Sequence, residues 1–176
     1  MSDLTNYQAP KDLLKDRVIL VTGAGQGMGR TAALTYAAHG ATLILHGRKV
    51  EKLESVYDEI EAAGGAQAAI FPLDLEKAGD QDFAALAQAI KLQLGRLDGI
   101  LHNAALVYGL TPLANQTLEQ WLTMLRVNLA APFALTRACL PPMRAKRWGR
   151  IVNISSGAAH FAGVVGIHYN AAKAGM

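Results

Sequence analysis

The alternation of short apolar runs with longer amphipathic stretches constrains the fold of this chain most. The apolar runs lie at 17–22, 41–46, 67–73, 97–102 and 150–155, and most are rich in β-branched residues and leucine. Helical spacing of apolar residues marks the segments between them, at about 28–39, 53–60, 80–94 and 117–144, and a further helix begins near His168. Strands that alternate with helices form parallel sheets covered on both faces, so the sequence predicts a doubly wound α/β fold of the Rossmann type.

The length and composition predict one folded domain over residues 1–176. Hydrophobic residues make up 51% of the chain and charged residues 18%, and no internal repeat or linker interrupts it. In the longest helical pattern, about 117–144, one stripe of apolar residues is expected to face the core: Trp121, Leu125, Leu129 and Phe133.

The charge pattern and the cysteine count argue against several classes of protein. The net charge of +3 comes from 17 basic and 14 acidic residues spread along the chain, which does not suggest nucleic acid as a partner. No run of apolar residues is long enough to cross a membrane, and 1–15 lacks the apolar core of a signal peptide. Cys139 has no partner for a disulfide and is expected to be a buried, inert thiol. We therefore expect a cytoplasmic protein, and no His, Cys or Asp spacing predicts a metal site.

A glycine-rich loop follows the first predicted strand and precedes the first predicted helix. Such a loop can hold a pyrophosphate with its backbone N–H groups and the helix dipole, because glycine lets the backbone approach the ligand closely. The alternative is a flexible turn, which the position directly after the first strand disfavours. The candidate cofactor-binding residues in this loop, which follows Thr22, are Gly23, Gly25, Gln26, Gly27, Met28 and Gly29.

The end of the second predicted strand favours NADP(H) over NAD(H). Dinucleotide folds that use NAD carry an acidic residue there, which hydrogen-bonds the ribose 2′-hydroxyl. Gly47 holds that place in this chain, and Arg48 follows it. A guanidinium can pair with a 2′-phosphate through charge-assisted hydrogen bonds. The alternative for Arg48 is a solvated residue at the start of a helix.

Tyr169 and Lys173 are four residues apart and therefore lie on one face of a helix. A neighbouring positive charge favours the phenolate form of a tyrosine, so Lys173 can prepare Tyr169 for proton transfer. A Tyr-x-x-x-Lys pattern alone also occurs by chance in many proteins.

Taken together, the Thr-Gly-x-x-x-Gly-x-Gly loop and the Tyr-x-x-x-Lys pair resemble the short-chain dehydrogenase/reductase family, and the resemblance extends from about Leu13 to Met176. It implies that Asp74 and Leu75 bind the adenine, although Asp74 could instead cap a turn. It also implies that Asn103 and Ala104 pack under the adenine ribose. The family's usual glycine is Ala105 here, so the backbone at that position is expected to avoid positive φ.

The same resemblance implies a catalytic group of Asn128, Ser156, Tyr169 and Lys173. Ser156 lies thirteen residues before Tyr169 and resembles the family serine that hydrogen-bonds the substrate oxygen; its neighbour Ser155 is the less well spaced alternative. Asn128 resembles the asparagine that holds a water between the lysine and bulk solvent, and its alternative is an ordinary helical asparagine. In the family's reaction Tyr169 transfers the proton, while Tyr169 and Lys173 also contact the nicotinamide ribose.

The resemblance therefore implies an NADP(H)-dependent oxidoreductase that acts on a small-molecule carbonyl or alcohol as a homodimer or homotetramer. The segments 13–20 and 97–103 look most like the YciK-type branch of bacterial short-chain oxidoreductases. Family members are usually longer, so the domain is expected to be incomplete after its fifth strand and the start of the next helix. Val107 to Leu113 and Gly157 to Ile167 are candidate pieces of the substrate pocket. The alternatives are a dinucleotide-binding module without catalysis, an oligomerisation scaffold and an inactive fragment of such an enzyme.

Overall fold

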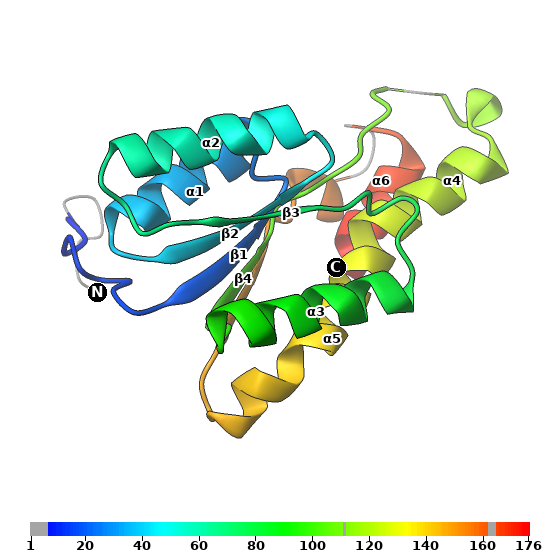
Figure 1. Cartoon of the computed structure of the whole chain (residues 1–176). Helices are drawn as coiled ribbons and strands as arrows, with labels where there is room; N and C mark the ends of the chain where they lie inside the picture. The colour runs from blue at the N-terminus through cyan, green and yellow to red at the C-terminus, as the bar shows by residue number, and fades with distance from the viewer. Residues whose placement is uncertain (1–6, 111, 162–164) are drawn as a thin grey trace.

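A computed structural model describes residues 7–110, 112–161 and 165–176 of the chain. These residues form a five-stranded parallel sheet in the order β3-β2-β1-β4-β5 (Figure 1). The strands are β1 (Val18–Thr22), β2 (Thr42–Gly47), β3 (Ala69–Pro72), β4 (Gly99–His102) and β5 (Arg150–Asn153). The predicted strands are confirmed, with ends that differ by one or two residues where the chain leaves the hydrogen-bonded ladder.

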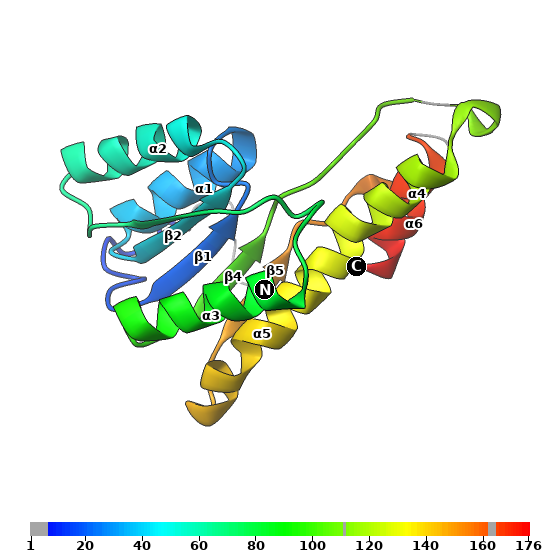
Figure 2. The same cartoon turned by 45° about the vertical axis from the view of Figure 1, so that its right-hand side comes forward.

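Helices cover both faces of the sheet, which confirms the doubly wound α/β prediction. Helices α1 (Gly27–Ala38) and α2 (Val50–Ala62) lie on one face, and α3 (Asp80–Leu94) and α5 (Ala131–Ala145) lie on the other (Figures 1 and 2). Helix α4 (Leu118–Leu125) packs beside α6 (Ile167–Gly175). Short 3₁₀ turns η2 (Leu113–Asn115) and η4 (Gly157–Ala159) precede α4 and α6.

Alternate residues of the strands supply two separate cores, because successive side chains of a strand point to opposite faces. Leu43, Leu45 and Leu101 pack with α1 and α2, whereas Leu20, Ile44 and Ile100 pack with α3 and α5. Cys139 of α5 is buried in the second core, which confirms the prediction. Burial raises the pKa of its thiol to about 11, so the thiol stays protonated and unreactive at neutral pH.

The inner stripe predicted for the long helical pattern is wrong. Phe133 is 64% exposed, and Trp121, Leu125 and Leu129 are only partly buried. The pattern is interrupted by a π-helical turn, η3 (Arg126–Ala130), which separates α4 from α5. A π turn contains an extra residue and so changes which side chains face the sheet. The buried residues of this segment are Met124, Val127, Asn128, Ala131, Pro132, Leu135, Cys139 and Met143.

The carboxyl ends of the parallel strands open at one edge of the sheet. The chain order reverses between β1 and β4, since β2 and β3 lie on one side of β1 and β4 and β5 on the other. Ligands of open α/β sheets bind in the crevice at such a reversal point. A ligand site is therefore expected among the loops that follow β1, β2, β3 and β4.

Candidate active site

The glycine loop connects β1 directly to α1, as predicted. Gly23 and Gly27 have φ of +67° and +55°, a backbone region that favours glycine. Gly29 lies so close to the backbone of Gly23 and to the side chain of Asn103 that a Cβ atom at Gly29 would overlap both. The loop is therefore held tightly against the end of β4, and its N–H groups stand at the amino end of α1.

Thr22 and Asn103 join the ends of β1 and β4. The Asn103 side chain donates to the Thr22 carbonyl at 3.0 Å, and the Thr22 hydroxyl accepts from the N–H groups of Asn103 and Ala104, each at 3.0 Å. Thr22 is 2% exposed, so these bonds are shielded from water. Ala105 is not among the described non-glycine residues with positive φ, in agreement with the prediction. The network fixes the loop backbone before any ligand arrives.

We expect Gly29→Ala to lower the free energy of unfolding by about 3 kcal/mol, because the new methyl group overlaps backbone that cannot move aside cheaply. Gly64→Ala is the control, since Gly64 has open space around it, although Gly64 has a positive φ of +74° and Gly29 does not. Only backbone strain opposes that change, which costs about 1 kcal/mol. Urea denaturation of both variants measures the difference, and equal losses would show that the close approach at Gly29 is unimportant.

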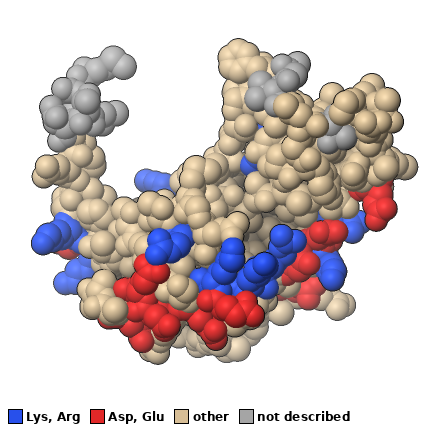
Figure 3. Space-filling model, turned by 90° about the horizontal axis from the view of Figure 1, so that it is seen from above, with Lys and Arg blue, Asp and Glu red and all other residues tan. Residues whose placement is uncertain are grey.

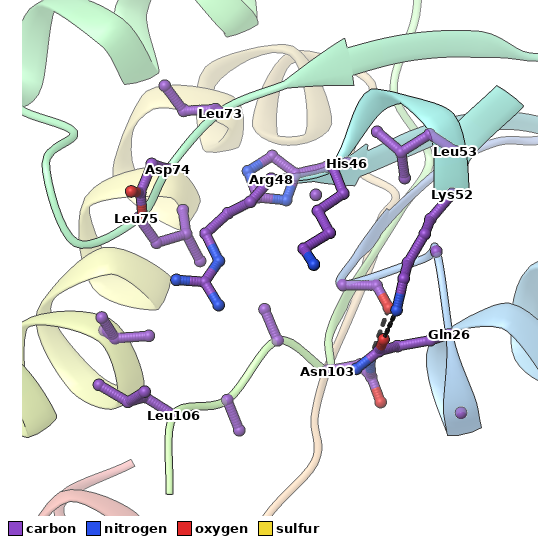
Figure 4. A pocket seen from close by; sticks show the side chains of 18 of the residues that line it. Gln26, His46, Arg48, Lys52, Leu53, Leu73, Asp74, Leu75, Asn103 and Leu106 are labelled. Carbon is purple, nitrogen blue, oxygen red and sulfur yellow. Dashed lines mark hydrogen bonds between the residues drawn. The ribbon is translucent and has the colours of Figure 1, made fainter.

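A cavity of about 490 Å³ lies over this loop and the ends of β2, β3 and β4 (Figure 4). Most of the predicted cofactor-binding residues line it: Gly23, Gly25, Gln26, Gly27, Met28, Arg48, Asp74, Leu75, Asn103 and Ala104. Gly29, Tyr169 and Lys173 do not line it. The cavity has the size of a pocket for a nucleotide-sized ligand.

Asp74 and Arg48 both have their side chains at this cavity (Figure 4). The Asp74 carboxylate also accepts the N–H of Glu76 at 3.1 Å, so the capping role that we considered as an alternative is present in this structure. One carboxylate oxygen serves that turn, which leaves the other oxygen available for a ligand. Arg48 reaches across the cavity from the end of β2 and forms no ion pair among the described residues.

His46 is a cavity residue that the sequence did not reveal. It is the penultimate residue of β2, is 1% exposed, and neither ring nitrogen has a hydrogen-bond partner. Burial lowers its pKa to about 4. The ring is therefore neutral at physiological pH. Alternation within the strand places it on the face opposite to Leu45, which only the observed register could establish.

Tyr169 and Lys173 lie one turn apart on α6, as predicted. The Lys173 ammonium is 5.8 Å from the centroid of the Tyr169 ring and donates to the carbonyl of Ile154 at 2.7 Å. Lys173 is 3% exposed, and burial lowers its pKa. Among the described residues no carboxylate pairs with it. A buried cation next to a phenol is suited to proton transfer, because it stabilises the phenolate.

Ser156 caps the η4 turn, which packs against α6. Its side-chain oxygen accepts the N–H of Ala158 at 3.1 Å. The hydroxyl proton has no acceptor among the described residues and can donate to a substrate oxygen. Asn170 fixes this turn, since its amide donates to the carbonyls of Ala158 and Phe161 at 2.8 and 2.9 Å.

Asn128 lies in the η3 π turn, which also packs against α6. Its side chain donates to the Leu106 carbonyl at 2.9 Å and accepts the Leu106 N–H at 3.1 Å. Asn128 is fully buried, and its amide also donates to the carbonyl of Met124 at 3.1 Å. Its side chain holds the loop after β4 in place. π turns often occur at functional sites, and hydropathy alone gave no sign of this one.

No described helix has the length and apolar character to span a membrane. Within 7–110, 112–161 and 165–176, no group of three or more His, Cys, Asp or Glu side chains is placed to hold a metal ion. The two candidate pocket segments contain residues 111 and 162–164, which lie outside the described residues.

The fold and the glycine-loop cavity define a dinucleotide-binding α/β protein, and comparison with known proteins narrows the class. The profile of the family described as short chain dehydrogenase matches residues 17–176. The chain therefore belongs to the short-chain dehydrogenase family, whose members are oxidoreductases.

One curated relative is the uncharacterized oxidoreductase YciK of Escherichia coli K12, with 45% identity over 151 residues, 86% of this chain and 60% of the relative. A solved short chain dehydrogenase from Shigella flexneri in complex with NADP matches with a TM-score of 0.89 and 41% identity, covering 94% of this chain and 69% of that protein. A solved homologue from Escherichia coli CFT073 in complex with NADPH has a TM-score of 0.90 and 42% identity, covering 95% and 70%. The chain thus spans about three fifths of the length of that curated relative.

Proposed function

We propose that the protein is an NADP(H)-dependent oxidoreductase that interconverts a carbonyl compound and its alcohol. The observation that carries the proposal is the buried Lys173 ammonium beside Tyr169, on a helix that packs against the turns bearing Ser156 and Asn128. A dinucleotide-binding protein without catalysis has no need of this arrangement. The proposed location is the cytoplasm.

The residues of the cavity fit a dinucleotide. Gly27 has no other atom within 4 Å of where a Cβ would stand, so the loop backbone is bare at the amino end of α1, where a pyrophosphate is stabilised by N–H groups and the helix dipole. Asp74 offers an acceptor for an adenine amino group, and Arg48 offers a cation for a 2′-phosphate. NADP(H), when bound, supplies or accepts the hydride.

The chain's own residues manage the proton and the substrate oxygen. During reduction Tyr169 gives its phenolic proton to the carbonyl oxygen, and Ser156 donates a hydrogen bond to the same oxygen. Lys173 stabilises the resulting phenolate through its charge. Asn128 holds the loop after β4 against the π turn.

Arg48→Asp tests the cofactor preference. We expect the ratio of the NADPH and NADH dissociation constants to shift by about tenfold or more toward NADH, because a carboxylate repels the 2′-phosphate and can accept a ribose hydroxyl. Calorimetric titration of both cofactors measures the ratio. An unchanged ratio would refute the role of Arg48.

We also propose a homodimer or homotetramer. Apolar side chains on α4 and α5 remain exposed, with Leu118 at 73%, Leu122 at 52% and Phe133 at 64%. Such a surface is typical of an association face. Light scattering of the purified protein measures its mass directly.

A further inference from the structure

Three of the residues that line the cavity are basic. Arg48, Lys49 and Lys52 all line the cavity, and none takes part in an ion pair among the described residues. Figure 3 shows Lys and Arg side chains gathered beside the hollowed middle of one face of the molecule. The cavity is lined by these three basic residues and by two acidic ones, Asp74 and Glu76, so its basic part favours an anionic ligand group.

Lys52 is tied to the glycine loop in two independent ways. Its ammonium donates to the side-chain oxygen of Gln26, as Figure 4 shows. Its Cβ packs on the loop at Gly25, where an added Cβ would lie 2.9 Å from it. Lys52 comes from the first turn of α2, so the absence of a side chain at Gly25 lets α2 and the loop approach each other.

The acidic side chains of the cavity lie elsewhere. Asp74 and Glu76 follow β3, and Figure 4 shows Asp74 on the side of the cavity opposite to Lys52. Asp74 and Glu76 therefore repel an anionic group from the β3 side of the cavity, and Lys52 attracts it toward the glycine loop. The side-chain amide oxygen of Gln26 is a neutral acceptor for the Lys52 ammonium. A phosphate oxygen in its place would form a stronger hydrogen bond with the ammonium, because both partners are then charged.

We propose that Lys52 is a second cation that binds the ribose 2′-phosphate, in addition to Arg48. In the ligand-free protein Gln26 holds the ammonium at the loop, and the phosphate takes the place of the amide when the cofactor binds. This inference rests on the proposed function, since it requires NADP(H) as the cofactor. It makes Lys52 a determinant of cofactor specificity that is separate from the glycine loop and from the end of β2.

The test is a calorimetric titration of wild type, Lys52→Gln, Lys52→Arg and the control Lys91→Gln with NADPH and with NADH. Lys91 is an exposed lysine in the last turn of α3 and does not line this cavity. We expect Lys52→Gln to weaken NADPH about tenfold and to leave NADH within about twofold, because one charge-assisted hydrogen bond is lost. Lys52→Arg retains the charge and should keep the preference, and Lys91→Gln should match wild type.

The two cofactors share the pyrophosphate and differ in the 2′-phosphate, so the comparison identifies which group Lys52 binds. An equal loss of NADPH and NADH affinity in Lys52→Gln would overturn the inference in favour of a pyrophosphate contact. Unchanged NADPH affinity would overturn it as well. If wild type prefers NADPH and Lys52→Gln keeps that preference, only the role of Lys52 fails; if wild type shows no preference, the proposed cofactor fails too.

Discussion

Tyr169→Phe is expected to lower kcat for carbonyl reduction by about 10²- to 10⁴-fold, the usual contribution of a general acid. The substitution removes the phenolic proton and keeps the ring that lies 5.8 Å from the Lys173 ammonium. The packing of α6 should therefore be retained, and NADPH affinity should stay close to that of wild type. The loss of NADPH absorbance with a panel of aldehydes and ketones measures the rate.

Tyr57→Phe is the matched control for this prediction. Tyr57 lies on α2, where its hydroxyl donates to Glu61 at 2.7 Å on the surface, far in the fold from α6. Its removal costs two exposed hydrogen bonds, to Glu61 and from Gln67, and should leave turnover unchanged. Turnover of Tyr169→Phe within about threefold of wild type would be incompatible with general acid catalysis by Tyr169.

The second large effect is a loss of stability in mild acid that arises from His46. Burial lowers the pKa of this histidine from 6.5 to about 4 in the folded protein. Between these values the unfolded chain binds a proton that the folded protein does not bind, so unfolding becomes more favourable as the pH falls. The contribution is fully present above pH 6.5 and is lost progressively down to about pH 4. The pKa difference corresponds to about 3 kcal/mol.

His46→Leu should reduce this acid sensitivity. Both ring nitrogens of His46 lack hydrogen-bond partners, so an apolar side chain of similar size costs little stability at neutral pH. Urea denaturation at about pH 7.5, above the transition, and at about pH 4.5, near its lower end, measures the change. His102 is also buried with a pKa of about 4, so part of the acid sensitivity should remain.

The exposed His160 supplies the control for the acid experiment, because it is a histidine that lies outside both cores. His160→Gln should lose stability in acid as wild type does. If His46→Leu also loses as much stability as wild type, His46 is not the source of the effect.

The sequence predicted the parallel sheet and the glycine loop because both depend on local signals. Each strand is a short apolar run, and the loop must follow the first of them for its N–H groups to reach a phosphate. The bond that Asn103 makes to Thr22 joins residues 81 positions apart, so the clamp between β1 and β4 depends on tertiary structure. No local pattern reports such a contact.

The interior of the long helical pattern could not be predicted for a different reason. Trp121, Leu125, Leu129 and Phe133 satisfy helical spacing, but the π turn and the contacts of Asn128 with Leu106 turn a neighbouring set of residues inward. The contact of Lys52 with Gln26 could not be predicted from the sequence either, because charged residues in the first turn of a helix usually face solvent. Hydropathy shows which side chains are apolar, but tertiary packing decides which of them face the core.

Calorimetric titration of the purified wild-type protein with NADPH, with NADH as the comparison, tests the central claim most directly. We predict saturable binding of NADPH at least about tenfold tighter than that of NADH, since Arg48 and Lys52 face the cavity without carboxylate partners among the described residues. Failure of the folded protein to bind NADPH, or equal affinity for the two cofactors, would contradict the account.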